Sequence, residues 1–281
     1  DLALVPKNVL DYADTTASFG PGLRERLTYV TELYGEEVHI LAGPDVLSIE
    51  NLSGKKVAVP LQDGNTEFTV RDLLHRLQIN AEVVKVAAAD AIDEVQSGTL
   101  AALVLMAGKP VRSVAELPSD GSLHLLAVPS TPALGDSYSP GIFGADDYPG
   151  LIPANQTIDT VSVAVVLVAN NSVKSEESDR RIVRFVPAFF ATLSEFSGPR
   201  RHPKWSEVNL AATLTGWQRF PAAKEWLDKA VREQTASAQR DFEEFLRAKS
   251  REGSLPRSPE QRRQLFGDYL KWTRGGTGSP N

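Results

Sequence analysis

A regular alternation of strands and helices between residues 57 and 128 is the feature that most constrains how this chain can fold. Short apolar stretches indicate strands, and apolar residues spaced three and four apart indicate helices packed on one side. The expected strands are residues 57–61, 82–86, 100–106 and 123–128. One expected helix carries its apolar stripe on Val70, Leu73, Leu74 and Leu77. Such a rhythm predicts a parallel sheet with helices on both faces, which places the chain in the α/β class.

Apolar segments on both sides of this region predict a second α/β lobe. Residues 2–5, 27–33, 38–41 and 161–169 are the strand candidates, with Gly35 between the second and third. We therefore expect residues 44–159 to form one lobe. Residues 1–43 and 160–281 are expected to form the other, with chain crossings near Gly43–Asp45 and Ile158–Thr160. The lobe built from both ends is expected to be incomplete, because its early strand lacks the strand and helix that this fold class places before it.

The C-terminal region, from Trp205 to Trp272, is expected to be a helical extension. Its outer positions are charged, and two apolar stripes indicate packing faces. These stripes are Phe242, Phe245 and Leu246, and Leu265, Phe266, Tyr269, Leu270 and Trp272.

Composition excludes several classes of function. The chain has 281 residues, of which 42% are apolar, enough for one large core or two moderate ones. A net charge of −6 without a dominant run of Lys or Arg argues against a nucleic-acid partner. The absence of cysteine removes disulfides, thiolate metal sites and cysteine nucleophiles.

Motifs of enzymes are also missing. The four histidines, His39, His75, His124 and His202, show neither HxH nor HExxH spacing. There is no G-x-S-x-G elbow, Walker A loop or G-x-G-x-x-G turn. The carboxylate pairs, such as Glu36-Glu37, are adjacent, and adjacent side chains diverge on a strand or helix. We therefore expect a binding protein without a cofactor, and not an enzyme.

The clearest candidate site follows the strand at residues 57–61. Gly64, Asn65 and Thr66 open the next helix, where free backbone N–H groups attract an anion. The alternative is a simple N-cap, in which the Asn65 or Thr66 side chain accepts an N–H bond. Asp63 bears on both interpretations, because its carboxylate can occupy the same N–H groups and repel an anionic ligand.

Other candidates lie at the ends of strands or at a bend. Gly108 and Lys109 follow a buried strand at the edge where α/β proteins place ligands, although a solvated Lys is an equal alternative. Tyr34 and Glu37 flank Gly35, where packing alone also explains them. Asn8 follows the first strand, where it either faces the space between the lobes or forms a turn.

A set of short motifs, in order and at consistent spacing, resembles the TAXI-type solute-binding subunits of tripartite ATP-independent periplasmic (TRAP) transporters. The resemblance extends from Asp1 to about Trp226. The matching segments are Asp1–Val5 ("D-l-A-l-v"), Leu33–His39 ("l-y-x-E-x-v-h"), Gly54–Val57 ("G-K-r-V"), Ala107–Pro110 ("a-G-h-P"), Asp159–Val163 ("v-x-T-v-x-v") and Phe220–Trp226 ("h-P-G-A-x-x-y").

The resemblance implies a two-lobe fold of the type II periplasmic-binding-protein class, whose first-lobe N-terminal region precedes Asp1. It implies a periplasmic or otherwise extracytoplasmic location behind a signal peptide or anchor. It also implies two partners: a small solute, either a carboxylate or an amino acid, and the membrane subunits of a transporter. This chain departs from the family's "G-x-x-G-S-g-t" ligand loop, where it has Leu61–Thr66. The alternative is a relative that has lost its solute site and acts as a protein-interaction or sensory module.

Overall fold

The computed structural model describes residues 2–171, 176–198, 200–251 and 258–274. The chain divides into two compact units, Asp1–Ala223 and Lys224–Asn281. Among the described residues, no helix combines the length and the apolar composition needed to cross a lipid bilayer.

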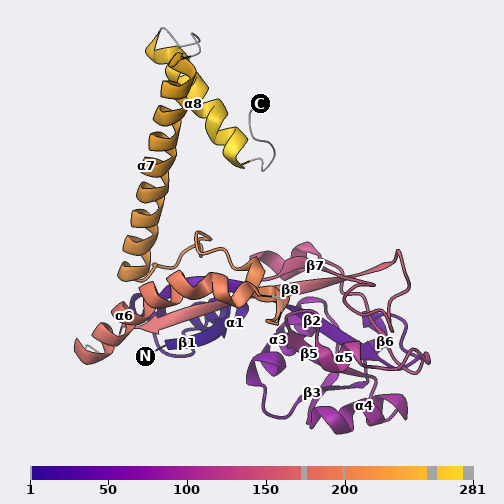
Figure 1. The fold of residues 1–281 in the computed structure, drawn as a ribbon. Helices are drawn as coiled ribbons and strands as arrows, with labels where there is room; N and C mark the ends of the chain where they lie inside the picture. Colours follow the sequence, from indigo (N-terminus) through magenta and orange to yellow (C-terminus); the bar gives the residue numbers. More distant parts are fainter. Residues whose placement is uncertain (1, 172–175, 199, 252–257, 275–281) are drawn as a thin grey trace. The chain divides into compact units, whose positions relative to one another are not determined.

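Eight strands form one mixed sheet within the described residues (Figure 1). The order along the sheet is β1-β8-β2-β5-β3-β4, while β6 pairs with β2 and β7 pairs with β8. Strand β3 is parallel to β4 and β5, and the other pairs are antiparallel. The strands are β1 (Leu2–Pro6), β2 (Leu27–Ala42), β3 (Lys56–Pro60), β4 (Glu82–Val86), β5 (Ala102–Ala107), β6 (His124–Leu125), β7 (Ser139–Gly144) and β8 (Thr157–Asn170).

The α-helices are α1 (Lys7–Thr15), α2 (Leu23–Arg26), α3 (Gly64–Arg76), α4 (Ala88–Gln96), α5 (Arg112–Ala115), α6 (Glu176–Thr192), α7 (Pro221–Arg251) and α8 (Pro259–Arg274). Helices α1 to α5 lie between strands in the sequence, and α6 to α8 come after the last described strand, β8. Short 3-10 turns occur at η1 (Ile49–Leu52), η2 (Pro132–Ser137), η3 (Leu193–Ser197) and η4 (Pro203–Glu207).

The parallel strands have an apolar core on each face, as the alternation of strands and helices predicts. On one face, Val57 of β3 belongs to the same core as Val70 and Leu73 of α3. On the opposite face, Ala58 of β3 belongs to a core that contains Ala91 of α4. Successive side chains of a strand point to opposite faces, so neighbouring residues of β3 serve different cores. The α/β class and the helices on both faces of this lobe are confirmed.

A third core holds the other lobe together. It contains Tyr29 of β2, Val166 of β8 and Leu10 of α1, with Leu214 and Trp217 from the segment before α7. This core therefore combines residues from both ends of the larger unit. The exact lobe boundaries near residues 43 and 159 stay a prediction.

Strand β2 runs through both lobes as one strand of 16 residues. The sequence predicts two strands around Gly35, and this prediction is wrong. Residues 27–37 pair with β8 and residues 37–42 pair with β5, with a register shift between Glu32 and Gly35. A bulge allows one strand to continue past a glycine while it bends, so the glycine marks an irregularity and not an end.

Two further expectations are corrected. The strand predicted at residues 123–128 is only His124–Leu125, antiparallel to β2. Beyond it the backbone changes partner, because the N–H of Leu126 donates to Ile40 and that of Val128 donates to Asp159. Between η4 and Pro221 the chain is also not helical, so the helical C-terminal region begins with α7.

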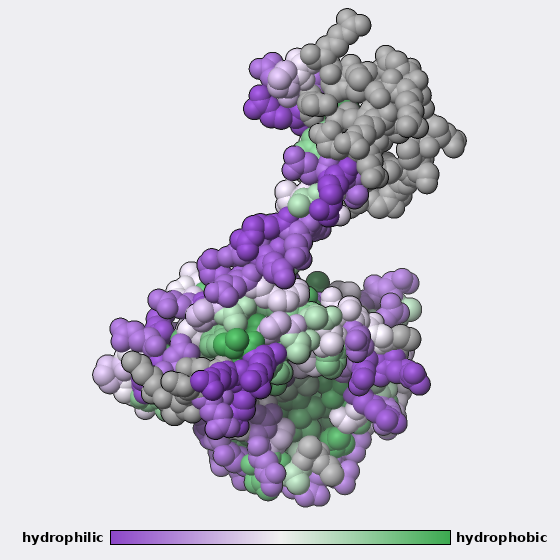
Figure 2. All heavy atoms as spheres, turned by 60° about the vertical axis from the view of Figure 1, so that its left-hand side comes forward, coloured by the Kyte–Doolittle hydropathy of each residue, from purple (hydrophilic) through white to green (hydrophobic). Residues whose placement is uncertain are grey.

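The smaller unit contains most of α7 together with α8. Phe242 is buried, and its ring centroid lies 5.0 Å from that of Phe266 and 5.5 Å from that of Tyr269. The predicted stripes therefore meet at these three residues, whereas the side chains of Phe245, Leu246, Leu270 and Trp272 lie outside the described part. Figure 2 shows that the column of α7 is mainly hydrophilic and that apolar side chains gather in a hollow of the larger unit.

Candidate functional site

The ends of β3 and β5 bring the predicted loops to one edge of the sheet. These neighbouring strands are parallel, with Val57 opposite Ala102. Strand β3 ends at Pro60 and β5 ends at Ala107, so Asp63 and Gly108 follow at the same carboxyl edge. Ligands of open α/β sheets bind at this edge, and the structure places most of the predicted site residues there.

Asp63 caps helix α3. Its Oδ1 accepts a hydrogen bond from Thr66 N at 3.0 Å, and its Oδ2 accepts one from Thr66 Oγ1 at 2.5 Å. The N–H of buried Thr66 is therefore satisfied within the protein. The acceptor is Asp63, and not Asn65 or Thr66 as the N-cap alternative expects; for Asp63 the sequence indicates only that its carboxylate can occupy these N–H groups. Gly64 and Asn65 are exposed, and a ligand contact to their N–H groups stays a prediction.

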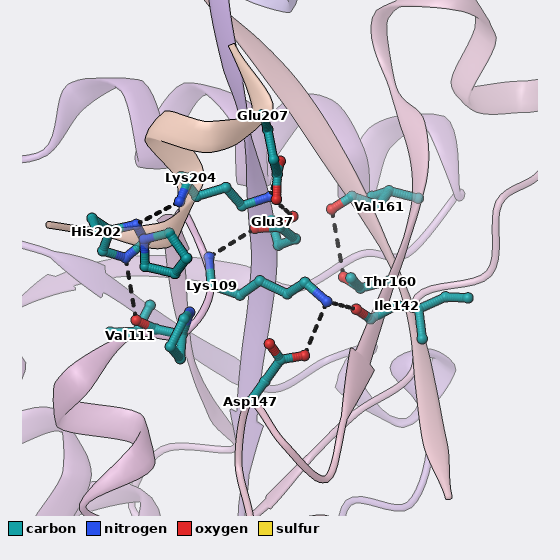
Figure 3. A network of polar contacts seen from close by, with 12 residues as sticks. Glu37, Lys109, Val111, Ile142, Asp147, Thr160, Val161, His202, Lys204 and Glu207 are labelled. Carbon is teal, nitrogen blue, oxygen red and sulfur yellow. Dashed lines mark hydrogen bonds and ion pairs between the residues drawn. The ribbon is translucent and has the colours of Figure 1, made fainter. Parts of the chain in front are cut away.

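Glu37 is a buried connector of three segments (Figure 3). Its Oε1 lies 2.5 Å from Lys204 Nζ of η4, and its Oε2 accepts the backbone N–H of Lys109 at 2.9 Å. Lys204 Nζ also lies 2.8 Å from Glu207 Oε2. These contacts satisfy the Glu37 carboxylate inside the protein, so they favour the packing interpretation of this residue.

The ammonium group of Lys109 is also engaged. It donates to the carbonyl oxygen of Ile142 at 2.6 Å and to Asp147 Oδ2 at 2.9 Å (Figure 3). Asp147 Oδ2 accepts the N–H of Gly144 as well. Lys109 thereby connects the end of β5 to β7 and to the turn after β7. Asp147 neutralises its charge in the structure without a solute.

Gly108 allows η4 to approach the sheet edge. A Cβ atom at this position would lie 2.6 Å from Lys204 Cγ and 3.4 Å from His202 Cε1. The first distance is shorter than van der Waals contact permits, so a side chain here would displace the buried stem of Lys204.

A pocket of about 360 Å³ lies beside Gly108. The aromatic rings of Tyr34 and Trp205 meet edge to face in its wall, with centroids 5.5 Å apart. The complete lining is Tyr34, Glu36, Ala107, Gly108, Pro110, Val111, Arg112, His202 and Trp205. We call this space the Tyr34 pocket.

Glu36 supplies a carboxylate to the Tyr34 pocket. Partial burial, together with the nearby charges of Asp63 and Glu37, raises the pKa of Glu36 to about 7. Burial and the Glu36 charge also raise the pKa of the Tyr34 hydroxyl. Within the described residues, the carboxylate of Glu36 has no hydrogen-bond or ion-pair partner. It is therefore the acidic group of this edge that is open to a ligand.

His39 is linked to the pocket wall through Tyr148, which contacts Val111. His39 is fully buried, and burial lowers its pKa to about 4, so the ring is neutral. Its Nδ1 lies 3.0 Å from the carbonyl oxygen of Glu37, which can only accept, so Nδ1 carries the proton. Nε2 then accepts from Tyr148 Oη at 2.6 Å, and Tyr148 Oη accepts the N–H of Val111 at 2.9 Å.

Asn8 lies elsewhere, between the lobes. It is buried in α1, and its Nδ2 donates to Thr69 Oγ1 of α3 at 3.0 Å and to Tyr138 Oη at 3.3 Å. Tyr138 Oη in turn donates to Asp72 Oδ2 at 2.8 Å. Asn8 therefore joins one lobe to the other, and the described structure shows it as a structural contact.

Sequence reasoning missed Glu36, His202 and Trp205. It identified the Glu36-Glu37 pair as diverging, which the structure bears out, because Glu37 binds Lys204 while Glu36 lines the Tyr34 pocket. The alternation itself could have pointed to Glu36, since it shares a strand face with Tyr34. No motif in the sequence around His202 or Trp205 predicts that these residues line a pocket. Within the described residues, no group of three His, Cys, Asp or Glu side chains could hold a metal ion.

Solved structures that align with the chain include solute-binding proteins and a regulatory domain. The regulatory domain of CcmR from Synechocystis PCC6803, in complex with 2-PG, is 13% identical with a TM-score of 0.35, covering 67% of this chain and 72% of that one. MatC from Rhodopseudomonas palustris, with bound malate, is 14% identical with a TM-score of 0.37, covering 66% and 63%. The P235GK mutant of ArgBP from T. maritima is 15% identical with a TM-score of 0.36, covering 62% and 58%.

For the last two structures, the aligned part spans less than two thirds of the other chain. No curated protein matches the chain. The model of the NMT1-like family matches residues 1–197, which is well over half of the sequence and contains strands β1 to β8. This protein belongs to the NMT1-like family.

Proposed function

We propose that this protein binds a small solute in the Tyr34 pocket and delivers it to a membrane transporter of the TRAP type. The observation that carries the binding role is the pocket itself. It lies at the carboxyl edge of the parallel strands and combines an aromatic wall with an open carboxylate. Family membership supports this role.

The same proposal places the protein outside the cytoplasm, most simply in the periplasm, where such receptors meet their solutes. The solute is an amino acid or another small molecule with a carboxylate, whose acidic group would meet the exposed N–H groups of Gly64 and Asn65. Lys109 supports this solute indirectly, because its backbone and ammonium group hold the loop after β5 in place.

Thermal unfolding in the presence of a solute library tests the binding role. A solute at a hundredfold excess over its dissociation constant stabilises the folded state by about 2.7 kcal/mol. The Trp205→Phe variant identifies the site, because it should reduce the stabilisation by any solute that contacts this wall. Stabilisation that is equal in the wild-type protein and in this variant would place the site elsewhere.

The alternative function is a protein-interaction or sensory module without a solute site. The unit that contains α8 lies outside the residues matched by the family model, and it has a hydrophilic helix surface suited to such a role. An interaction module predicts no stabilisation by any solute of the library.

A further inference from the structure

We propose that the Tyr34 pocket selects a solute with a cationic group, of the ammonium or guanidinium kind, which sits against Glu36 and the aromatic wall of Tyr34 and Trp205. This inference rests on the proposed function, since it names the chemistry of the solute that the pocket takes. It is carried by the balance of charges around the pocket and by the nature of its wall.

The cations near the pocket are already paired. Lys109 binds Asp147, at 2.9 Å, and Lys204 binds Glu37, at 2.5 Å. Arg112 lines the pocket, but its Nε donates to Glu116 at 2.7 Å, and its side chain is 90% exposed. An anionic solute would therefore find no free positive side chain in the described lining.

The carboxylates are arranged in the opposite way. Glu36 faces the pocket without a partner among the described residues, and Asp63 adds negative charge close by. A partly buried carboxylate without a partner is unfavourable in the empty protein. A bound cation would remove this cost, and it would form a charge-assisted hydrogen bond with Glu36.

The aromatic wall suits the same chemistry. Tyr34 and Trp205 are half-buried, and their rings meet edge to face at 77°. The faces of Trp and Tyr rings attract cations, and aromatic pockets bind ammonium groups in this way. An aromatic wall next to a single open carboxylate provides both components of an ammonium site.

Binding of a cation should depend on pH, because the bound form requires Glu36 to be ionised. The pKa of Glu36 is raised to about 7 in the empty protein, so affinity should increase from pH 6 to pH 8. Several other charged or titratable groups face this carboxylate or the same pocket. They are Tyr34 and Glu37 on β2, Asp63 at the start of α3, Arg112 on α5, and His202 and Lys204 at η4.

The test is calorimetry with choline, its uncharged analogue 3,3-dimethyl-1-butanol, agmatine and malate as probes, at pH 6 and pH 8. We expect choline or agmatine to bind, with an affinity that increases with pH, and the uncharged analogue to bind at least tenfold more weakly. The Glu36→Gln variant should weaken cation binding by about tenfold to a hundredfold and abolish its pH dependence. Trp205→Ala should weaken it by about threefold to thirtyfold.

Two variants serve as controls. Glu82→Gln removes the same charge from the exposed start of β4, so it should leave the affinity unchanged. His202→Asn removes the imidazole that lines the pocket and keeps Glu36, so the pH dependence should persist in this variant.

Each contrary result has a defined meaning. If malate or the uncharged analogue binds with Trp205-dependent affinity while both cations do not, the cation inference is wrong and the solute-binding function stands. If Glu36→Gln binds cations as tightly as the wild-type protein, the inference is also wrong. If none of the probes and no member of the solute library binds, the inference and the proposed function fail together.

Discussion

Lys204 and Glu37, which are 167 residues apart in the sequence, form a buried ion pair with 2.5 Å between Nζ and Oε1. Their side chains are 4% and 5% exposed. The pair fastens η4 to the carboxyl edge of the sheet, and this contact brings Trp205 to the wall of the Tyr34 pocket. Neither Lys204 nor Glu37 lines the pocket, yet their ion pair holds the pocket wall in place.

Lys204→Met should destabilise the protein by about 3–5 kcal/mol, because it leaves the Glu37 carboxylate buried without its cation. The double variant Lys204→Met with Glu37→Gln should recover much of this loss, since a neutral Gln still accepts the N–H of Lys109. Urea unfolding of the four proteins of this cycle measures the coupling. A loss below about 1 kcal/mol in the single variant would contradict the buried pair.

Gly108→Ala should destabilise the protein by about 1–3 kcal/mol, because the new methyl group would lie 2.6 Å from Lys204 Cγ. The matched control is Gly64→Ala at the start of α3, where the added atom meets nothing within 4 Å. That control should be neutral or slightly stabilising. Equal unfolding midpoints for the two variants would mean that η4 does not approach Gly108 closely.

Asn8→Ala should cost about 1–3 kcal/mol, because it removes the buried donor to Thr69 and Tyr138 that joins the two lobes. Asn65→Ala, an exposed position in the first turn of α3, should change the stability by less than about 0.5 kcal/mol. Thermal unfolding compares the two. Equal unfolding midpoints for the two variants would contradict the buried contact of Asn8 with Thr69 and Tyr138.

Glu36→Gln should stabilise the empty protein, and more so as the pH rises. The pKa of Glu36 is raised from 4.5 to about 7 in the folded state, so the folded state holds this proton more tightly than the unfolded state. The wild-type protein therefore loses stability as the pH rises from about 4.5 to 7 and this carboxyl ionises, whereas the variant does not. We expect a difference of about 1–2 kcal/mol at pH 8, allowing for solvent screening.

The measurement is urea unfolding at pH 5 and pH 8, with Glu82→Gln as the control. His39 contributes in the opposite sense, because its lowered pKa makes the folded state lose stability as the pH falls from 6.5 towards 4. This contribution is present in both the wild-type protein and the variants, so it cancels in their difference. A difference between wild type and Glu36→Gln that does not grow with pH would contradict a raised pKa for Glu36.

The sequence by itself determined the local elements and their class. The apolar spacing after Gly64 predicted α3, and the alternating segments predicted the parallel strands β3, β4 and β5 with helices on both faces. Asp63 was recognised as a group that can occupy the N-terminus of α3, and it does so. These features follow from interactions between residues a few positions apart, or from which face of an element is apolar, and both are written in the sequence pattern.

Only the tertiary structure decided the site. Tyr34 and Trp205 are 171 positions apart in the sequence. They meet because the buried ion pair of Glu37 and Lys204 holds η4 against the sheet edge. The same folding pairs Lys109 with Asp147 and leaves Glu36 open. Whether a charged side chain is neutralised or available depends on which distant segment packs against it. Local sequence patterns do not predict which charged side chains are paired, because the pairing depends on segments that are far apart in the sequence and meet only in the folded protein.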